Sequence, residues 1–520
     1  MHEQNNGEVL VSDWTEGYVA DIGYTYGYYT ELNPQSVALA FLNAGLAVPA
    51  SATACELGFG QGISANIHAA ATGTQWWGTD FNPSQAAFAQ ELAGQGGGAR
   101  LFDQAFDEFC ARGDLPEFDY IGLHGIWSWI SDENRQVIVD FLRRKLKVGG
   151  VLYISYNTMP GWAAFAPLRD LLTGHSEVMG TPGQGIVHRI ESALGFAEKL
   201  MAANPAYARA NPQVPDRIKR IKEQNRNYLA HEYFNRDWLP MSFDRMARWL
   251  EPAKLGYACS AHYLDHIEAI NLSPEQQTLL KEIPDAGFRQ TVRDFCINQQ
   301  FRKDYWVRGQ RRIAPIEQAE ALRAQRILLA QPRADVSLKV NGSLGEASMQ
   351  DAVYAPILDA LADHQPRSLG QLEQQVRGQG VNFAQLMQAV MILVGNGTAY
   401  AVQDEATVGK SRRVTDRLNA FLSGKARASG DIGFLASPVT GGGVPVARFQ
   451  QLFLMAPSQA RKQPAELAKS AWTVIAAQGQ RIMKDGKALE TEAENLAELQ
   501  QQAELFVSKQ LPILKALGIA

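Results

Sequence analysis

The clearest pattern of apolar and polar positions lies early in the chain. A short apolar run, Thr53 to Leu57, is typical of a buried strand, and glycines follow it at positions 58, 60 and 62. From Ile63 to Ala70 the apolar residues recur at helical spacing. The pattern predicts a strand, a tight glycine turn and a helix. In such a turn the backbone approaches a ligand closely because no Cβ intervenes, and the helix N-terminus offers unpaired N–H groups to it.

The same alternation continues along the first third of the chain. Apolar runs at 75–80, 99–102, 118–124 and 151–156 predict strands, with helix-start signals between them. Two further candidates, 257–261 and 305–308, would complete a sheet of seven strands. Strands that alternate with helices predict an α/β fold with a doubly wound, mainly parallel, Rossmann-like sheet.

The remaining sequence is predicted to be mostly helical. Residues 163–235 break the alternation and are expected to form a helical insertion, and 314–331 a helical connector. The region 350–402 has the helix, helix, strand order of a winged helix, but it lacks a basic recognition face. A role in protein interaction or structure is therefore favoured over DNA binding. Glycine-rich 435–446 is predicted to be a mobile loop. The expected domains are 1–162, a regulatory region with the sheet-completing strands at 163–313, and a C-terminal domain at 314–520.

Composition narrows the class of protein. Of 520 residues, 46% are hydrophobic and 20% are charged, which is typical of globular chains. The N-terminus has no signal-peptide pattern, and no apolar run reaches the length of a membrane span, so stable membrane insertion is not expected. The four cysteines have neither metal nor redox spacing, so a reducing cytoplasm fits best and no metal site is predicted.

Charge is distributed unevenly. Residues 1–150 carry 7 Lys or Arg against 18 Asp or Glu, whereas the rest of the chain carries 42 against 36. An acidic first part argues against nucleic acid as a partner and suits a basic substrate such as a lysine-bearing protein. An ordinary solvated surface explains the same imbalance.

The glycine turn carries further information about its ligand. No Gly-Lys-Ser/Thr follows it, which excludes a Walker loop, and Ile63 stands where a dinucleotide turn has its third glycine. Glu56 precedes the first glycine by two positions, and such a carboxylate suits a ligand with a cationic amino group and a sulfonium. Asp80 lies 22 residues beyond Gly58, close to the spacing at which an acidic side chain accepts hydrogen bonds from ribose hydroxyls.

At these residues the chain resembles a known family. Glu56 to Gly62, with Asp80, resembles motifs I and II of class I S-adenosylmethionine-dependent methyltransferases. His124–Trp129, Ser155–Trp162 and Tyr228–Asn235 are similar to narrower motifs of the methyltransferases that carry a methyltransferase regulatory domain. That group includes the lysine methyltransferases of bacterial outer-membrane proteins. The resemblance covers residues 15–310 well and extends more loosely to 446.

The resemblance implies S-adenosyl-L-methionine as cofactor and gives the matching positions roles. The turn would hold the methionine part, with Glu56 at its amino group, and Asp80 would bind the ribose with Phe81 beside the adenine. The segment after the third strand would border the base, and the end of the fourth strand would lie near the transferring methyl. The expected cofactor-binding residues are Glu56, Gly58, Phe59, Gly60, Asp80, Phe81, Gln104, Ala105, Phe106, His124 and Gly125.

Substrate contacts are expected at the rim of the sheet and in the aromatic segment 13–32. That segment would form a lid over the pocket or cover the core. Trp127 and Trp129 would form an aromatic channel or pack the helical insertion, and His231 would connect the regulatory region to the rim. Asn235 replaces the second histidine of a zinc motif, so His231 is not expected to bind metal. The predicted substrate-binding residues are Tyr18, Tyr24, Trp127, Trp129, Tyr156, Asn157, Trp162 and His231.

The favoured function is N-methylation of lysine side chains in a protein substrate. Two alternatives remain: a small-molecule methyltransferase with an accessory domain, and a cofactor-binding scaffold without activity. No residue is identified as a catalytic base, because methyl transfer from an activated sulfonium depends mainly on proximity and orientation. The sequence carries no indication of oligomeric state.

Overall fold

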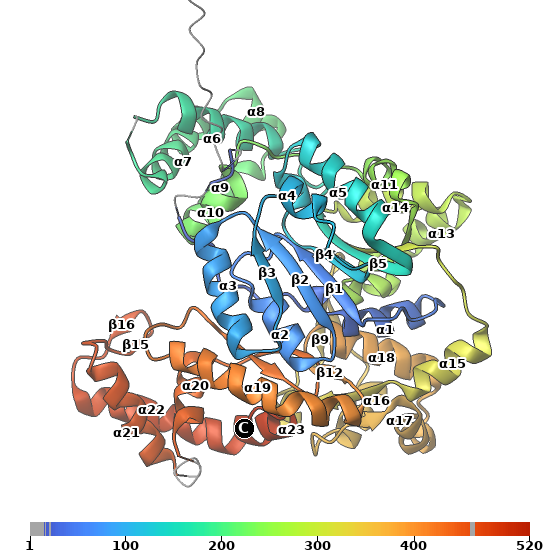
Figure 1. The fold of residues 1–520 in the computed structure, drawn as a ribbon, viewed down its shortest axis with the longest axis vertical. Coiled ribbons are helices and arrows are strands. Elements are labelled where there is room, and N and C mark those ends of the chain that lie inside the picture. Colours follow the sequence, from blue (N-terminus) through green and yellow to red (C-terminus); the bar gives the residue numbers. More distant parts are fainter. Residues whose placement is uncertain (1–14, 16, 20–21, 182, 458–462) are drawn as a thin grey trace, which may run out of the picture.

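A seven-stranded sheet lies at the centre of the computed structural model, which describes residues 15, 17–19, 22–181, 183–457 and 463–520 (Figure 1). The strand order is β3-β2-β1-β4-β5-β7-β6. Strands β1 to β5 run parallel, and β7 is antiparallel to both of its neighbours. The strands are β1 Thr53–Leu57, β2 Gln75–Asp80, β3 Arg100–Asp103, β4 Phe118–Leu123, β5 Leu146–Asn157, β6 Leu255–Ser260 and β7 Phe301–Arg308. The predicted doubly wound α/β fold is confirmed, including its two late strands.

The helices of this part begin where the sequence signals place them. Asn33 caps α1 and Asn82 caps α3, each accepting a hydrogen bond from a backbone N–H, with a proline in the first turn. Apolar side chains fill both faces of the sheet and form two separate core clusters. The helices are α1 Pro34–Asn43, α2 Ile63–Ala71, α3 Pro83–Gln95, α4 Phe106–Ala111 and α5 Asp132–Lys145.

The predicted helical insertion follows β5 and has an apolar core of its own, which includes Trp162 and Phe165. It lies at the upper left of Figure 1. Further helices lead from it to the strands β6 and β7. The helices of the two groups are α6 Ala166–Val178, α7 Ile186–Ala202, α8 Ala206–Ala210, α9 Val214–Lys222, α10 Arg226–Tyr233, α11 Phe243–Leu250, α12 Glu268–Asn271, α13 Pro274–Glu282 and α14 Ala286–Ile297. The domain limits at 162 and 313 stay predictions, since β5 and β7 belong to one sheet.

The C-terminal part contains the helix, helix, strand order expected for 350–402, but its sheet has an unexpected member. The central strand of the order β11-β8-β12 is β8, Arg326–Leu329, which lies inside the predicted helical connector. The connector helix α15 ends at Ala324. Buried pairing of β8 with β11 and β12 outweighs the helical tendency of the preceding residues. The other elements here are β9 Lys339–Gly342, β10 Gly345–Ser348, α16 Asp351–Ala360, β11 Arg367–Ser368, α17 Leu369–Val376, α18 Phe383–Gly395 and β12 Ala399–Val402.

The expected mobile loop at 435–446 is instead an ordered hairpin, so that prediction is wrong. Strands β13 (Phe434–Ser437) and β14 (Gly442–Pro445) pair and pack against α2. A Cβ on Gly443 would lie 2.9 Å from ring carbons of Tyr28, and one on Gly442 would lie 2.5 Å from its hydroxyl. The glycines therefore permit a close approach between the hairpin and Tyr28, rather than mobility.

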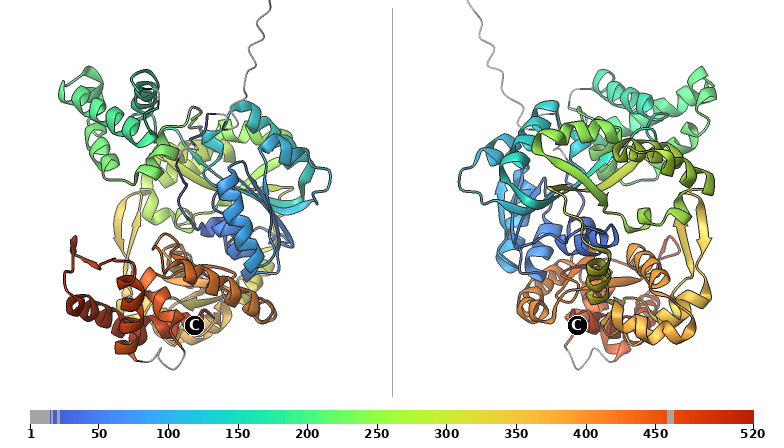
Figure 2. Two further views of the ribbon diagram at one scale, coloured as in Figure 1. Left: turned by 60° about the vertical axis from the view of Figure 1, so that its left-hand side comes forward. Right: turned by 90° about the vertical axis from the view of Figure 1, so that its right-hand side faces the viewer.

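The remaining helices complete a layer beneath the sheet. Figure 2 shows the C-terminal elements and the helical insertion at opposite ends of the molecule in both views. Among the described helices, none is both long and apolar enough to cross a membrane. The last elements are α19 Glu405–Lys425, α20 Arg448–Met455, α21 Pro464–Ala476, β15 Met483–Lys484, β16 Lys487–Ala488, α22 Glu492–Leu505 and α23 Leu511–Ala516.

Candidate active site

The glycine turn closes the carboxyl end of β1. Gly58, Gly60 and Gly62 have φ values of 76°, 57° and 69°, in the left-handed region that favours glycine. The N–H of Gly58 donates to the carbonyl of Thr79 at 2.8 Å, which fixes the turn against β2. A Cβ on Gly58 would lie 2.3 Å from Cδ1 of Ile126. The bare backbone therefore forms one wall of a pocket at the rim of the sheet.

This pocket has a volume of about 1110 Å³ including its open mouth. Open α/β sheets bind ligands at this position, outside the carboxyl ends of the strands. The structure brings every sequence-predicted cofactor residue into its lining, from four consecutive strand ends. These are Glu56, Gly58, Phe59, Gly60, Asp80, Phe81, Gln104, Ala105, Phe106, His124 and Gly125.

Two buried carboxyl groups give the pocket its electrostatic character. Oε2 of Glu56 has no hydrogen-bond partner in the described part of the chain, and burial raises the pKa of this side chain well above its usual range. Asp80 accepts hydrogen bonds from the backbone N–H groups of Gly60 and Asn82 at 2.8 and 3.0 Å. Burial raises the pKa of Asp80 to about 7 despite these bonds. An orphaned carboxylate oxygen beside an aspartate suits a ligand with a cation and hydroxyl groups.

An aromatic strap, the described residues between Thr15 and Tyr29, covers the pocket. Tyr18, Tyr24 and Tyr29 all line the cavity. The Tyr18 ring meets Phe81 edge-on at 5.6 Å, and the Tyr29 ring stacks on His124 at 3.7 Å between centroids. In the segment 13–32 that was predicted to form a lid, residues 13, 14, 16, 20 and 21 lie outside the described residues. In its described part the strap supplies an aromatic wall opposite the glycine turn.

His124 is held as a neutral imidazole. Its Nδ1 lies 2.7 Å from the hydroxyl of Tyr153, whose ring is nearly parallel to the imidazole at 6.0 Å between centroids. The Tyr29 ring covers the face of the imidazole. Burial lowers the pKa of His124 to about 3. A group with so low a pKa is a weak general base near neutral pH, so His124 is suited to shaping the pocket and not to proton removal.

The eight predicted substrate residues divide into two groups. Tyr18, Tyr24 and Trp129 line the pocket. His231 lies behind it, where Nε2 contacts the carbonyl of Ile22 at 3.1 Å and the ring packs on Tyr18 and Tyr24. It thereby connects α10 to the strap, as expected for a contact between the regulatory region and the rim.

The other four are placed away from the pocket, which corrects the expectation of a direct substrate contact. Trp127 is fully buried and directs Nε1 toward Sδ of Met241. The Tyr156 hydroxyl donates to buried Asp304, and Asn157 is 1% exposed. Trp162 belongs to the core of the helical insertion. Such burial leaves these side chains no surface for a substrate in this conformation, and they hold the walls in position.

Sequence reasoning missed several pocket residues. Tyr29 stands in the aromatic segment that the sequence singled out, so its position gave a usable signal. Other missed residues lie in the same aromatic segment, in the glycine turn (Gln61) or in the motif His124–Trp129 (Ile126), so these regions also gave a signal. The rest come from loops and helix starts whose spacing carries no recognisable pattern. The missed lining residues are Thr15, Thr25, Gly27, Tyr29, Gln61, Gln85, Ile126, Ile130, Ser131, Asn134 and Asp237.

Comparison with known proteins agrees with this geometry. Residues 225–308 match the family model described as a predicted methyltransferase regulatory domain. Over the whole chain, the fold is similar to PKMT2 from Rickettsia typhi, solved in complex with AdoHcy. The TM-score is 0.69 at 17% identity, and the match covers 95% of this chain and 100% of that one. This likeness concerns the fold.

The sheet, the glycine turn with its acidic neighbours and the regulatory domain define a class I S-adenosylmethionine-dependent methyltransferase that carries a methyltransferase regulatory domain. An uncharacterised Synechocystis protein, sll1526, is 42% identical over 513 residues, covering 98% of this chain and 100% of its own length. The chain belongs to the same family as sll1526. A Rickettsia prowazekii protein, RP028, is 27% identical over 36% of this chain and 76% of its own length.

Proposed function

We propose that this methyltransferase methylates the side-chain amine of lysine in a protein substrate. The observation that carries the proposal is the tyrosine wall of the pocket, formed by Tyr18, Tyr24 and Tyr29. Aromatic faces attract a cationic head and also accommodate the apolar stem of a lysine side chain. The resemblance to the lysine methyltransferases of bacterial outer-membrane proteins, and the name of the structural relative PKMT2, support the same acceptor.

The residues at the rim suit the cofactor. In the proposed arrangement the orphaned carboxylate of Glu56 binds its amino group, and Asp80 accepts hydrogen bonds from the ribose hydroxyls. Phe81 lies beside the adenine, and Gln104 to Phe106 border it. When bound, S-adenosylmethionine supplies a methyl group on a positively charged sulfur, which is an activated donor. The chain itself then mainly orients the acceptor and excludes water.

A lysine must reach the donor as a neutral amine. The tyrosine wall removes water from the ammonium, and desolvation lowers its pKa. Glu232 on α10 adds a negative field that reaches Tyr18, Tyr24 and Tyr29, and burial raises its own pKa to about 7. This field attracts the ammonium to the rings. We therefore assign the proton loss to desolvation as the side chain enters the pocket, with the proton released to bulk water. Glu232 guides the side chain while it is still charged.

The deciding experiment incubates the full chain with methyl-radiolabelled S-adenosylmethionine and a lysate of its own cell. We expect a labelled protein band. In a parallel lysate whose lysine amines have been blocked by acetylation, which leaves a non-nucleophilic amide, the band should disappear. Label confined to small molecules would favour the small-molecule alternative, and a band that survives blocking would exclude lysine as the acceptor.

The strap offers a matched pair of variants for the same assay. Tyr24 lines the pocket, whereas Tyr26, two residues later, packs on Phe88 outside it. Tyr24→Ala should raise KM for the protein substrate about tenfold, as expected for the loss of a desolvated cation–π contact. Tyr26→Ala should leave KM within twofold. Equal KM values in both variants would contradict the role of the tyrosine wall.

The cytoplasm is the proposed location of the enzyme. Cys55, Cys110 and Cys259 are buried free thiols, and Cys296 is a half-buried one. Free thiols persist most readily in a reducing compartment.

A further inference from the structure

A second cavity opens beside β6, the edge strand of the sheet, away from the glycine turn. Its volume is about 1020 Å³, open side included. Residues from β6, β7 and the helices α12 to α14 line it, and all of them fall within the region that matches the regulatory-domain model. The lining is predominantly polar and charged, unlike that of the active-site pocket.

Two arginines on α14 face this cavity one helical turn apart. Arg289 donates from Nε and Nη2 to the carbonyl of Ile283 at 3.1 and 2.6 Å. Arg293 donates from Nη2 to the carbonyl of Asp265 at 3.1 Å. In the described part of the chain, neither guanidinium has a carboxylate oxygen within 4.0 Å. The carbonyl bonds hold both groups in place without neutralising them.

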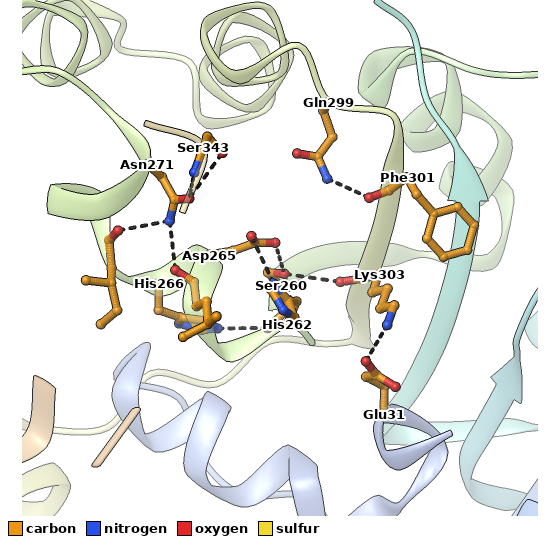
Figure 3. A network of polar contacts seen from close by, with 12 residues as sticks. Glu31, Ser260, His262, Asp265, His266, Asn271, Gln299, Phe301, Lys303 and Ser343 are labelled. Atoms are coloured by element: carbon orange, nitrogen blue, oxygen red, sulfur yellow. Dashed lines mark hydrogen bonds and ion pairs between the residues drawn. The ribbon is translucent and has the colours of Figure 1, made fainter. Parts of the chain in front are cut away.

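The other charged groups of the cavity are mostly paired. Buried Arg302 contacts Asp294 at 2.6 Å and Asp304 at 2.8 Å. Asp265 accepts from the Ser260 hydroxyl at 2.7 Å and lies 3.2 Å from Nδ1 of His262 (Figure 3).

At the exposed margin, Lys281 and Glu268 contribute one charge of each sign. Arg289 and Arg293 are therefore the two guanidinium groups of the described lining that have no carboxylate partner. This pair, and not the net charge of the lining, favours an anion.

The guanidinium N–H groups of Arg289 and Arg293 that donate no hydrogen bond to a described residue indicate which kind of ligand the cavity could bind. In the hydrogen bonds of the described chain, Nη1 of Arg289 and both Nε and Nη1 of Arg293 have no acceptor. A guanidinium fork binds a carboxylate or phosphate through two parallel hydrogen bonds. We propose that this cavity binds a small anionic ligand, whose carboxylate or phosphate group lies between Arg289 and Arg293.

Polar contacts lead from this site toward the active site. The backbone of Asp265 holds Arg293, and its carboxylate accepts from Ser260, whose Oγ also lies 3.3 Å from the carbonyl of Lys303 on β7. Nζ of Lys303 pairs with Glu31 at 2.5 Å, two residues beyond Tyr29 of the strap (Figure 3). A ligand between the arginines would thus contact the same polar network that anchors the end of the strap.

The test uses the full chain and two probes, inorganic phosphate and succinate, with sodium chloride at matched ionic strength as reference. Binding is measured by calorimetry and by the shift in unfolding temperature. The double variant Arg289→Gln/Arg293→Gln should weaken binding of the preferred probe at least tenfold. The control Arg311→Gln/Arg312→Gln removes the same charge from two exposed residues outside the cavity and should bind within twofold of wild type.

The outcomes are distinct. Binding of phosphate alone identifies a phosphate site, and binding of succinate alone a carboxylate site. Neither probe binding above the chloride reference would overturn the proposal, as would equal binding by wild type and the double variant. If the double variant does not fold, Arg289→Gln and Arg293→Gln singly carry the test, each with an expected loss of several-fold. Single variants that bind like wild type would then refute it.

Discussion

Two buried carboxyl groups with raised pKa values, those of Glu56 and Asp80, line the same pocket. Glu56 lies one residue before the end of β1, and Asp80 ends the neighbouring strand β2. Burial raises the pKa of both side chains, and the charge of Asp80 raises the pKa of Glu56 further. An isolated buried carboxylate is unfavourable, whereas one that meets a cation is stabilised. The cofactor-free protein therefore stores in these two residues an energetic cost that a cationic ligand relieves.

Replacing Glu56 separates this binding role from stability. Glu56→Gln should weaken binding of S-adenosylmethionine about 10- to 100-fold, because a charge-assisted hydrogen bond is lost. The free energy of unfolding should stay equal or rise, since a buried acid without a partner is removed. Calorimetry and denaturant unfolding measure both quantities. The control Glu117→Gln makes the same change at an exposed position; an equal loss of affinity there would contradict the assignment.

The raised pKa of Asp80 predicts that the contribution of this residue to the free energy of unfolding depends on pH and falls as pH rises. Its pKa of about 7 in the folded protein lies above the unfolded value of about 3.9. The folded state therefore binds more protons between these values, and the contribution of Asp80 to the free energy of unfolding falls as pH rises from about 4 to about 7. Relative to Asp80→Asn, wild type should lose up to about 4 kcal/mol over this range. Urea unfolding at pH 5 and pH 8 tests this, and a constant difference would refute it.

At this scale the sequence placed all of the expected cofactor residues in the pocket lining but only three of the eight expected substrate residues. Glu56 and Asp80 have positions fixed by strand ends and a glycine turn, which are local patterns. Trp127 follows β4 and Tyr156 is the penultimate residue of β5, yet both side chains turn into the core. Whether a rim side chain points into the pocket depends on packing between distant elements, which spacing does not specify.

The glycine turn is the element whose geometry matters most for binding. Its left-handed residues let the backbone pass Ile126 and reach the ligand without an intervening side chain. The hairpin of β13 and β14 uses glycine for a comparable purpose against Tyr28. The first could be interpreted from the sequence because a strand with an acidic residue near its end precedes the turn and a helix follows it. Sequence analysis misinterpreted the second because a close approach and a mobile loop have the same composition.

A pair of glycine variants separates backbone strain from steric clash. Gly58 and Gly98 have φ values of 76° and 71°, but only at Gly58 would a Cβ meet a neighbour. Gly98→Ala should cost about 1–2 kcal/mol from left-handed strain alone. Gly58→Ala adds a clash worth about 1–3 kcal/mol and should abolish measurable cofactor binding. Thermal unfolding and calorimetry check both. Similar losses of affinity in the two variants would show that the close approach at Gly58 is unimportant.

At the scale of the whole molecule, helix α2 packs both on the central sheet and on the C-terminal part of the chain. One core cluster joins Ile63 and Ile67 of α2 to Leu418 and Leu422 of α19. Gln403 donates to the carbonyl of Ala71 at the end of α2, at 2.7 Å. Sequence periodicity predicted helices here but could not assign their partners, because contacts between residues hundreds of positions apart leave no local pattern.

The C-terminal layer should therefore be required for the catalytic part to fold. A fragment of residues 1–403 would expose Ile63, Ile67 and Leu92, each worth about 1.5–3 kcal/mol when buried. It should lose cooperative unfolding and cofactor binding in circular dichroism and calorimetry. In the full chain, Leu418→Ala should cost about 2–5 kcal/mol, and exposed Arg417→Ala less than 0.5 kcal/mol. A fragment as stable as the full chain would contradict this dependence.

The position of β7 has a consequence for synthesis on the ribosome. β7 is the last strand of the main sheet to be made, yet it enters between two older strands and is the neighbour through which β6 joins the sheet. Until residue 301 has emerged, β5 has an open outer edge and β6 has no partner in that sheet. Unpaired edges are templates for aggregation. A nascent chain stalled between residues 260 and 301 is thus the species most in need of chaperone protection, although its glycine turn has already been synthesised.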